Sequence, residues 1–313
     1  KTTGLGSLGS NFGTKVASRQ ATAPRQIIYG KARVGPVFSH IETTGTDNYL
    51  LHTVMVLAGH EVEELVSVRL NDTDLTTTTS TISGSTVHTV TNSKYKNTEN
   101  DNKFDGTGAL IRYTFEDGSH TAVNGFMDAQ LSSITSDHKY LGCSYIYMQM
   151  VYDAEAFGGL PNISAVVKGK KVYDPRSDST AWSDNPALII RDYLSNTEYG
   201  LKATSSELND TTNAGGFAAA ANICDQTVTL ADGVSTEKRY TSNGLTNMSA
   251  RGDQLFQGLL SSMSGKLSYV NGQFCVFAGA SQTPSLTITD DELLAEVQVT
   301  TQANNGDLFN GVK

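Results

Sequence analysis

The sequence has few of the residues that usually indicate a metal site, a disulfide framework or a membrane span. Its only three cysteines, Cys143, Cys224 and Cys275, lie far apart and form no CxxC pair. We therefore interpret each as a buried thiol. No apolar run approaches the ~20 residues that a membrane helix needs. No signal peptide is recognised either, and the start at Lys1 is compatible with the earlier removal of a segment.

Basic residues are also in the minority. The chain of 313 residues has 23 Lys and Arg against 32 Asp and Glu, a formal charge of −9. This balance argues against a nucleic-acid clamp, which needs clustered positive charge to neutralise phosphates. Only 6 prolines and 1 tryptophan occur, whereas glycine numbers 29 and Thr, Ser, Asn and Asp are abundant. That composition favours many strands joined by turns, and the length favours about two domains.

The pattern along the chain predicts a β-rich first part. Residues 1–24 contain little to bury and are predicted to be a flexible arm, and their Gly4, Gly6 and Gly9 lack the βαβ context of a dinucleotide site. Residues 25–183 are predicted to form a β-rich domain with a polar insertion at 71–103. Within this domain the continuous apolar run 50–58 is typical of a strand that is covered on both faces.

The second part changes to capped helices. We predict an α+β module over 184–313, with helices near 185–198, 206–224 and 250–264 and a hairpin at 266–278. The first helix has clear boundaries, because Asp184 and Asn185 suit a cap, Pro186 suits the first turn, and Gly200 suits a left-handed C′ position.

We expect the key side chains of the first helix and of the hairpin to have structural roles. We expect the buried stripe of the first helix to include Leu188, Ile189, Tyr193 and Leu194, with Tyr199 and Gly200 at its end. Asn271 and Gly272 form the preferred two-residue type I′ turn of the hairpin.

Candidate catalytic and metal motifs are incomplete. His60 opens HEVEE, but the fifth residue is Glu64 where a zinc protease needs a second histidine. The stretch 101–108 is similar to a calcium loop, but Arg112 stands where a bidentate glutamate belongs. An Arg-Gly-Asp tripeptide ends at Asp253, which we interpret as a first-turn acid of the third helix. We therefore expect no metal, no cofactor and no catalytic residue.

Adjacent carboxylates leave one enzymatic alternative, a hydrolase acting on cell-wall glycans. The groups are Glu63-Glu64, Glu116-Asp117 and Asp290-Asp291-Glu292. Hydrolysis needs two carboxyls about 5 to 9 Å apart across a sugar. Neighbours on a strand point to opposite faces, so the first two pairs are poorly placed, and the third fits a capped helix start better.

Four segments in order resemble a known family. They are NPALIIRDYLSNTEYGL, ANICDQTV, RYTSNGLT and LFQGLLSSMSGKLSYVNGQFCVFAG, and 25–183 adds IIYGKARVGP, YLLHTVMVLAGHEVEEL and ISAVVKGKKVYDPR. They are similar to segments of the tail tip (central tail fibre) protein J family of lambda-like long-tailed phages and prophages. One departure is Ser242, which stands where the family motif has cysteine.

The resemblance implies a structural protein of mainly β, α+β fold class, with tail-hub β-barrel domains and a helical module. Three copies would close the tail tube as a hub in the virion, at the tail tip, after synthesis in the bacterial cytoplasm. The implied partners are other copies of the chain, the tail tube and other tail tip proteins. A host receptor would be reached through a region beyond Lys313, and DNA would pass through without specific binding. Besides the hydrolase, a surface adhesin is a weaker alternative; a deep aromatic cleft with paired carboxylates would favour the hydrolase.

Overall fold

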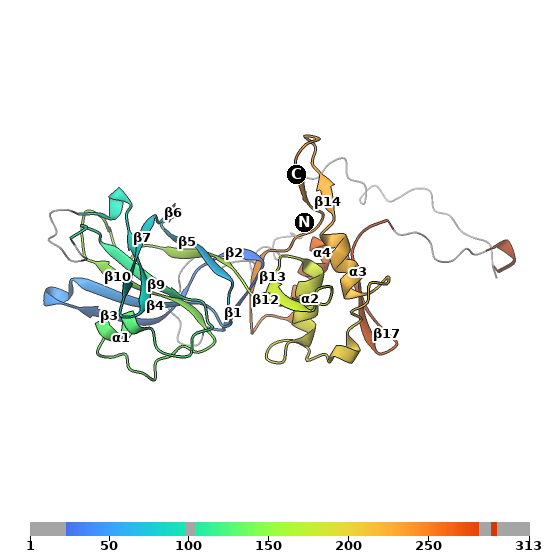
Figure 1. Ribbon diagram of the computed structural model, residues 1–313, viewed down its shortest axis with the longest axis horizontal. Helices are drawn as coiled ribbons and strands as arrows, with labels where there is room; N and C mark the ends of the chain where they lie inside the picture. Colours follow the sequence, from blue (N-terminus) through green and yellow to red (C-terminus); the bar gives the residue numbers. More distant parts are fainter. Residues whose placement is uncertain (1–22, 98–103, 105, 282–288, 293–313) are drawn as a thin grey trace, which may run out of the picture. The chain divides into compact units, whose positions relative to one another are not determined.

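The computed structural model describes residues 23–97, 104, 106–281 and 289–292, and the arm expected at 1–24 lies almost wholly outside them. The chain divides into two compact units, Lys1–Gly279 and Ala280–Lys313. In the described part of the second unit, one 3₁₀ turn, η4 (Asp290–Glu292), is formed. The first unit contains strands in several sheets together with four α-helices in its described residues, which confirms the mainly β, α+β class (Figure 1).

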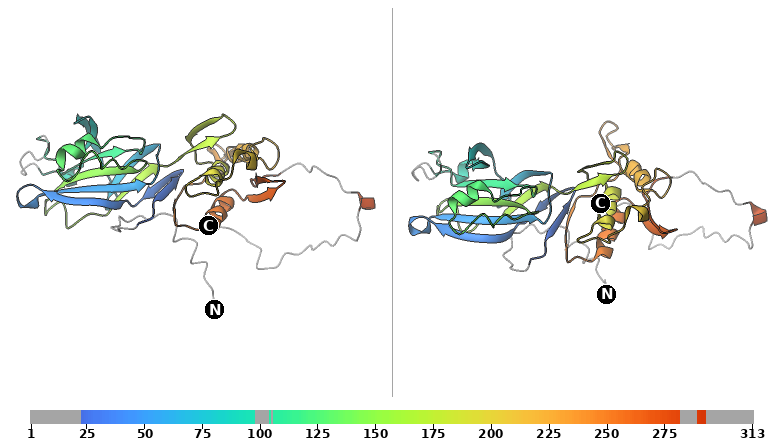
Figure 2. Two further views of the ribbon diagram at one scale, coloured as in Figure 1. Left: turned by 90° about the horizontal axis from the view of Figure 1, so that it is seen from below. Right: turned by 60° about the horizontal axis from the view of Figure 1, so that its bottom comes forward.

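Two antiparallel sheets form the part that we call the sandwich. The larger sheet has the order β3 (Val37–Thr44), β4 (Leu50–Ala58), β10 (Ser144–Val151), β9 (Ile111–Glu116), β8 (Ser85–Val90) and β7 (Thr77–Ile82). The smaller has the order β2 (Lys31–Val34), β11 (Ile163–Lys168), β5 (Glu64–Leu70) and β6 (Thr73–Asp74). Figure 2 shows the strands of this part in two further views.

The larger sheet is covered on both faces. Met148 and Met150 of β10 belong to the core shared with the smaller sheet, whereas Tyr145 and Tyr147 point the other way into a second cluster. Helix α1 (Gly125–Gln130) closes that second cluster, and its Asn124 cap accepts from the amide of Met127. Every residue of β10 is therefore buried. Strand β4 is buried nearly throughout, as the apolar run 50–58 predicted.

One expectation needs correction. The expected β-barrel is absent from the described residues, where both sheets are open and pack face to face. The predicted polar insertion at 71–103 supplies β6 and the hairpin of β7 and β8, before the undescribed residues 98–103. In β8, Val87 and Val90 are buried, whereas Thr86 is exposed and His88 and Thr89 are half-buried.

The helical module follows the sandwich along the chain. It contains α2 (Pro186–Ser195), α3 (Phe217–Cys224) and α4 (Gly252–Ser262), and the hairpin of β17 (Lys266–Val270) and β18 (Gln273–Phe277). Two further hairpins pair β12 (Lys171–Asp174) with β13 (Ser179–Trp182), and β14 (Thr227–Thr229) with β15 (Thr236–Lys238). Short 3₁₀ turns are η1 (Thr46–Asn48), η2 (Ser93–Tyr95) and η3 (Ser205–Glu207). One apolar core unites α2, α3, α4 and the β17–β18 hairpin.

The helix expected at 206–224 is split. Its first turn is η3, closed by a capping box between Thr204 and Glu207, and α3 begins only after Gly216. Gly215 has a positive φ of 89°, which interrupts the helical path. The loop between them brings Leu208 into the core of the helical module.

Strand β1 (Gln26–Tyr29) connects the two cores. It pairs with β16 (Gly244–Asn247), more distant in sequence than any other strand partner in the described chain. Ile28 lies in the sandwich core, whereas Ile27 and Tyr29 lie in the core of the helical module. Because successive strand residues point to opposite faces, four residues contribute to both cores.

Candidate functional site

The start of α2 is fixed by a buried asparagine. The side-chain oxygen of Asn185 accepts from the amide of Ala187 at 3.1 Å, and its amide group donates to the carbonyl of Ala221 in α3 at 2.9 Å. Pro186 follows at the first helical position, where its missing N–H costs no hydrogen bond. One side chain thus caps one helix and attaches it to another.

The apolar residues of α2 face the module core. Leu188 and Leu194 are 1% and 0% exposed. Tyr193 packs edge-on against Phe256 of α4, with ring centroids 5.2 Å apart, and also contacts Tyr199 at 5.9 Å. The predicted stripe therefore meets α3, α4 and the chain that follows α2.

The end of α2 differs from the expectation. The helix stops at Ser195, and Gly200 does not have the positive φ expected of a C′ residue. The side chain of Asn196 accepts from the amides of Glu198 and Tyr199 and completes the turn earlier. Gly200 is required for another reason, because a Cβ there would lie 1.9 Å from the carbonyl oxygen of Tyr193.

A buried polar cluster joins α2 to β1. The ammonium of Lys170 donates to both carboxylate oxygens of Asp192, at 2.9 and 2.8 Å, and to the hydroxyl of Tyr199 at 2.8 Å. The hydroxyl of Tyr29 donates to the same carboxylate at 2.6 Å. Burial disfavours the charged lysine, but Asp192 and Tyr199 outweigh it and raise the Lys170 pKa. Burial, followed by the charge of Asp192, raises the pKa of Tyr29 well above its usual value.

His60 fixes β1 from the sandwich side. Its Nε2 accepts from the amide of Ile28 at 2.9 Å, so Nδ1 carries the proton and donates to the carbonyl of Glu61 at 2.7 Å. Burial lowers the pKa of His60 to about 4, which keeps the ring neutral at physiological pH. His60 thus holds β1 in place, and among the described residues it belongs to no group of side chains placed to hold a metal.

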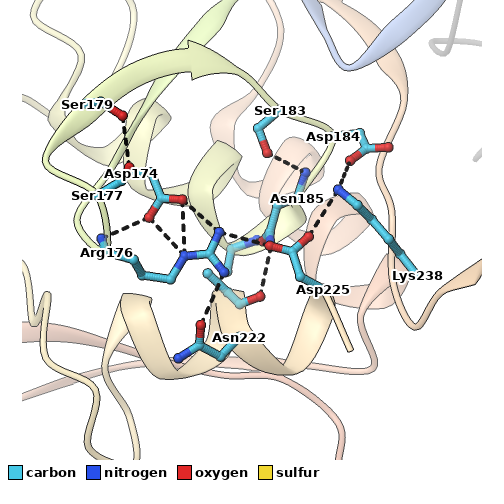
Figure 3. A network of polar contacts seen from close by, with 12 residues as sticks. Asp174, Arg176, Ser177, Ser179, Ser183, Asp184, Asn185, Asn222, Asp225 and Lys238 are labelled. Atoms are coloured by element: carbon cyan, nitrogen blue, oxygen red, sulfur yellow. Dashed lines mark hydrogen bonds and ion pairs between the residues drawn. The ribbon is translucent and has the colours of Figure 1, made fainter. Parts of the chain in front are cut away.

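A second polar network surrounds the N-terminal end of α2 (Figure 3). Arg176 pairs with Asp174 at 2.7 Å and with Asp225 at 2.8 Å. Lys238 then joins Asp225 to Asp184, at 3.1 and 3.0 Å. Burial opposes ionisation of Asp225, but Lys238 and Arg176 lower its pKa overall. The network ties the β12–β13 hairpin, α3 and β15 around the start of α2.

The type I′ turn expected at Asn271 and Gly272 is formed in the β17–β18 hairpin. Asn271 and Gly272 have φ values of 51° and 80°, as a type I′ turn requires. Tyr269 beside this turn is 57% exposed and packs on Phe274 across the hairpin. A Cβ on Gly272 would meet no atom within 4 Å, so the turn is open to its surroundings.

Two of the three carboxylate groups do meet, in a groove that the sequence did not predict. Glu63, Glu64, Glu116 and Asp117 line a groove of about 650 Å³ between β5 and β9. Glu64 pairs with Lys168 at 2.6 Å. Despite its partial burial, Asp117 has a lowered pKa, because the amide and hydroxyl of Ser119 donate to it. A glycosidase acid needs a raised pKa, so this direction does not favour the hydrolase.

Other chemical candidates find no support among the described residues. They contain no group of three or more His, Cys, Asp or Glu side chains placed to hold a metal. Half of the stretch similar to a calcium loop, residues 101–103 and 105, lies outside the described residues. No described helix is long and apolar enough to cross a bilayer. All three cysteines are free, and burial raises the pKa of Cys224 to about 12.

Sequence reasoning missed the Lys170–Asp192 cluster. Tyr29 and Asp192 are separated by 163 positions, and no local spacing connects them. The sequence contained one weak signal of this cluster. The charged Asp192 stands directly before Tyr193, beside the apolar stripe of α2.

Comparison with known proteins shows sequence similarity to a phage protein over about half of the chain. No protein-family model matches the sequence. The tip attachment protein J of Escherichia phage SECphi27 is 30% identical over 168 residues, which cover 48% of this chain and 14% of that protein. Among solved structures, a chain in the virion of a native gene transfer agent particle aligns with 12% identity and a TM-score of 0.32, over 50% of this chain and 28% of that chain. That TM-score is too low to establish a common fold, so the sequence similarity carries the comparison.

Proposed function

We propose that this chain is a structural component of a phage tail tip, where three copies form a hub that closes the tail tube and carries the host-recognition region. The observation that carries the proposal is the similarity to a tip attachment protein. The geometry supports a load-transmitting role, because β1 contributes to two cores and polar clusters fix both ends of α2. A connector of this kind sets orientation and requires no reaction.

Labelling of intact virions tests this role. Antibody raised against the chain should decorate the distal end of the tail in electron micrographs, and a reconstruction of the tip should contain three copies. Label on the capsid, or one or six copies per tail, would contradict the hub. The partners expected in that reconstruction are other copies of the chain, the tail tube and other tip proteins.

Binding of duplex DNA and hydrolysis of cell-wall glycans are the two activities that we expect the hub to lack. The hub should show no measurable affinity for duplex DNA at ~150 mM salt, where nonspecific binders typically have dissociation constants of about 10⁻⁴ to 10⁻⁶ M. Turbidity clearing of purified cell walls should be absent as well. Clearing that is lost on Glu116→Gln would replace the structural role by the hydrolase.

A further inference from the structure

The groove lies between β5 and β9, which belong to different sheets of the sandwich and do not pair with each other. On one side, β5 pairs with β11 along its length, whereas on the other side β6 reaches only Arg69 and Leu70. Within the described chain, the stretch 64–67 therefore has no strand on its second side. Val66 in this stretch is 38% exposed. A strand with one unpaired side beside a groove offers backbone groups to an added extended segment.

The lining of the groove selects the chemistry of such a segment. Leu65, Leu75 and Phe115 supply apolar surface, and Glu63, Glu64, Glu116 and Asp117 supply carboxylates. Two lysines already contact this rim: Lys168 pairs with Glu64, and Lys171 pairs with Glu61 at 2.8 Å and lies 3.7 Å from Glu63. Exposed pairs of this kind contribute little and exchange readily. More carboxylates than lysines remain, so the groove favours a basic segment with apolar residues between its charges.

We propose that residues 1–22 of the same copy occupy this groove. They contain Lys1, Lys15 and Arg19 and no acidic residue, in a chain with 32 acidic and 23 basic side chains. Phe12 and Val16 lie among these charges and match the apolar surface of the groove. The proposal does not depend on the tail tip role.

The starting point of the segment lies within reach. The carbonyl of Gln26 accepts from the amide of Gly59, and Glu63 follows four residues later. From Ala23 to Glu63 this route crosses about seven residues of chain and one step of about 5 Å between paired segments, an upper limit of about 30 Å. Lys15 lies eight residues before Ala23, so its backbone extends up to about 29 Å from it, and the long lysine side chain adds further reach. Lys15 therefore reaches the rim of the groove without help from a second copy, and Arg19, four residues before Ala23, lies on the path to it.

Zero-length cross-linking of the full chain tests the contact. A carbodiimide should join the Lys15 ammonium to Glu63, Glu64, Glu116 or Asp117, and the link should disappear at 1 M salt, where the Debye length falls to about 3 Å. An equal mixture of ¹⁴N- and ¹⁵N-labelled chains identifies the copy. Links within one isotope support the proposal. Mixed-isotope links would assign the groove to a second copy's segment and overturn it, as would the absence of Lys15 links to the groove.

Proteolysis gives an independent readout with a matched control. Trypsin should cleave after Lys15 and Arg19 about tenfold faster in the double variant Glu63→Gln/Glu116→Gln than in the parent, because two exposed charge pairs are lost. Glu198→Gln changes an exposed carboxylate in the helical module and should leave both cleavage rates unchanged. Thermal melts of all three proteins verify that each is folded. Equal cleavage rates in folded double variant and parent would overturn the proposal.

Discussion

The sandwich and the helical module are stabilised in different ways. The sandwich buries whole strands between two apolar clusters, and β10 has no exposed residue. The module is built from helices of 8 to 11 residues and short hairpins, around a core closed by polar clusters at both ends of α2. Isolated helices of that length are marginal in water, so their order depends on packing and on fixed ends. We therefore expect the module to be more sensitive than the sandwich to single polar substitutions.

The largest effect should come from the cluster between α2 and β1. Asp192→Ala leaves the buried Lys170 ammonium without its carboxylate, and unfolding in urea should show a loss of about 3 to 5 kcal/mol. Lys170→Met combined with Asp192→Leu should recover most of that loss. The exposed pair of Arg251 and Asp253 is the control, since Asp253→Ala should leave the urea midpoint nearly unchanged. Similar losses for both aspartates would remove the distinction between the regions.

A pair of neighbouring isoleucines tests whether the two cores unfold together. Ile27 and Ile28 are 1% and 0% exposed but belong to different cores. Each change to alanine should cost about 2 to 5 kcal/mol and should lower the same calorimetric transition, because β1 is shared. Two transitions, each shifted by only one variant, would show that the sandwich and the module are independent.

Acid should weaken the contact between β1 and the sandwich through His60. Its pKa is about 4 in the folded chain against 6.5 for a free histidine, so the folded state binds fewer protons between these values. Stability therefore falls as the pH decreases from 6.5 to 4, by up to about 3 kcal/mol for this group. His60→Gln should remove that part of the pH dependence, and the exposed His138→Gln should not. Parallel stability profiles for His60→Gln and the parent would contradict this.

The smallest effect is expected at the turn of the β17–β18 hairpin in the helical module. Gly272 has φ +80° and open space around it, so Gly272→Ala should cost about 1 kcal/mol through backbone strain alone. Gly158 also has open space but no positive φ, and its change to alanine should be neutral in the same thermal melt. Equal melting temperatures for the two variants would show that the turn is not strained.

Local chemistry predicted local structure well and distant contacts poorly. Asn185 and Pro186 indicated where α2 begins, and the apolar run 50–58 indicated a strand buried on both faces, because capping and alternation act over a few residues. The end of α2 was misplaced because Asn196 closes the turn with its side chain before Gly200 is reached. The groove and the cluster of Tyr29 with Asp192 depend on how sheets and helices pack, which no short pattern in this sequence encodes.

The shared strand has a consequence for folding during synthesis. β1 is synthesised before its partner β16, which ends at Asn247, more than 200 residues later. At about 5 to 20 residues per second, about 10 to 40 s pass between the synthesis of Ile27 and Tyr29 and the synthesis of β16. The core of the helical module cannot be completed before then. The sandwich residues up to Lys168 are complete well before then, so the sandwich can hold β1 by Ile28 while the rest of the chain is made.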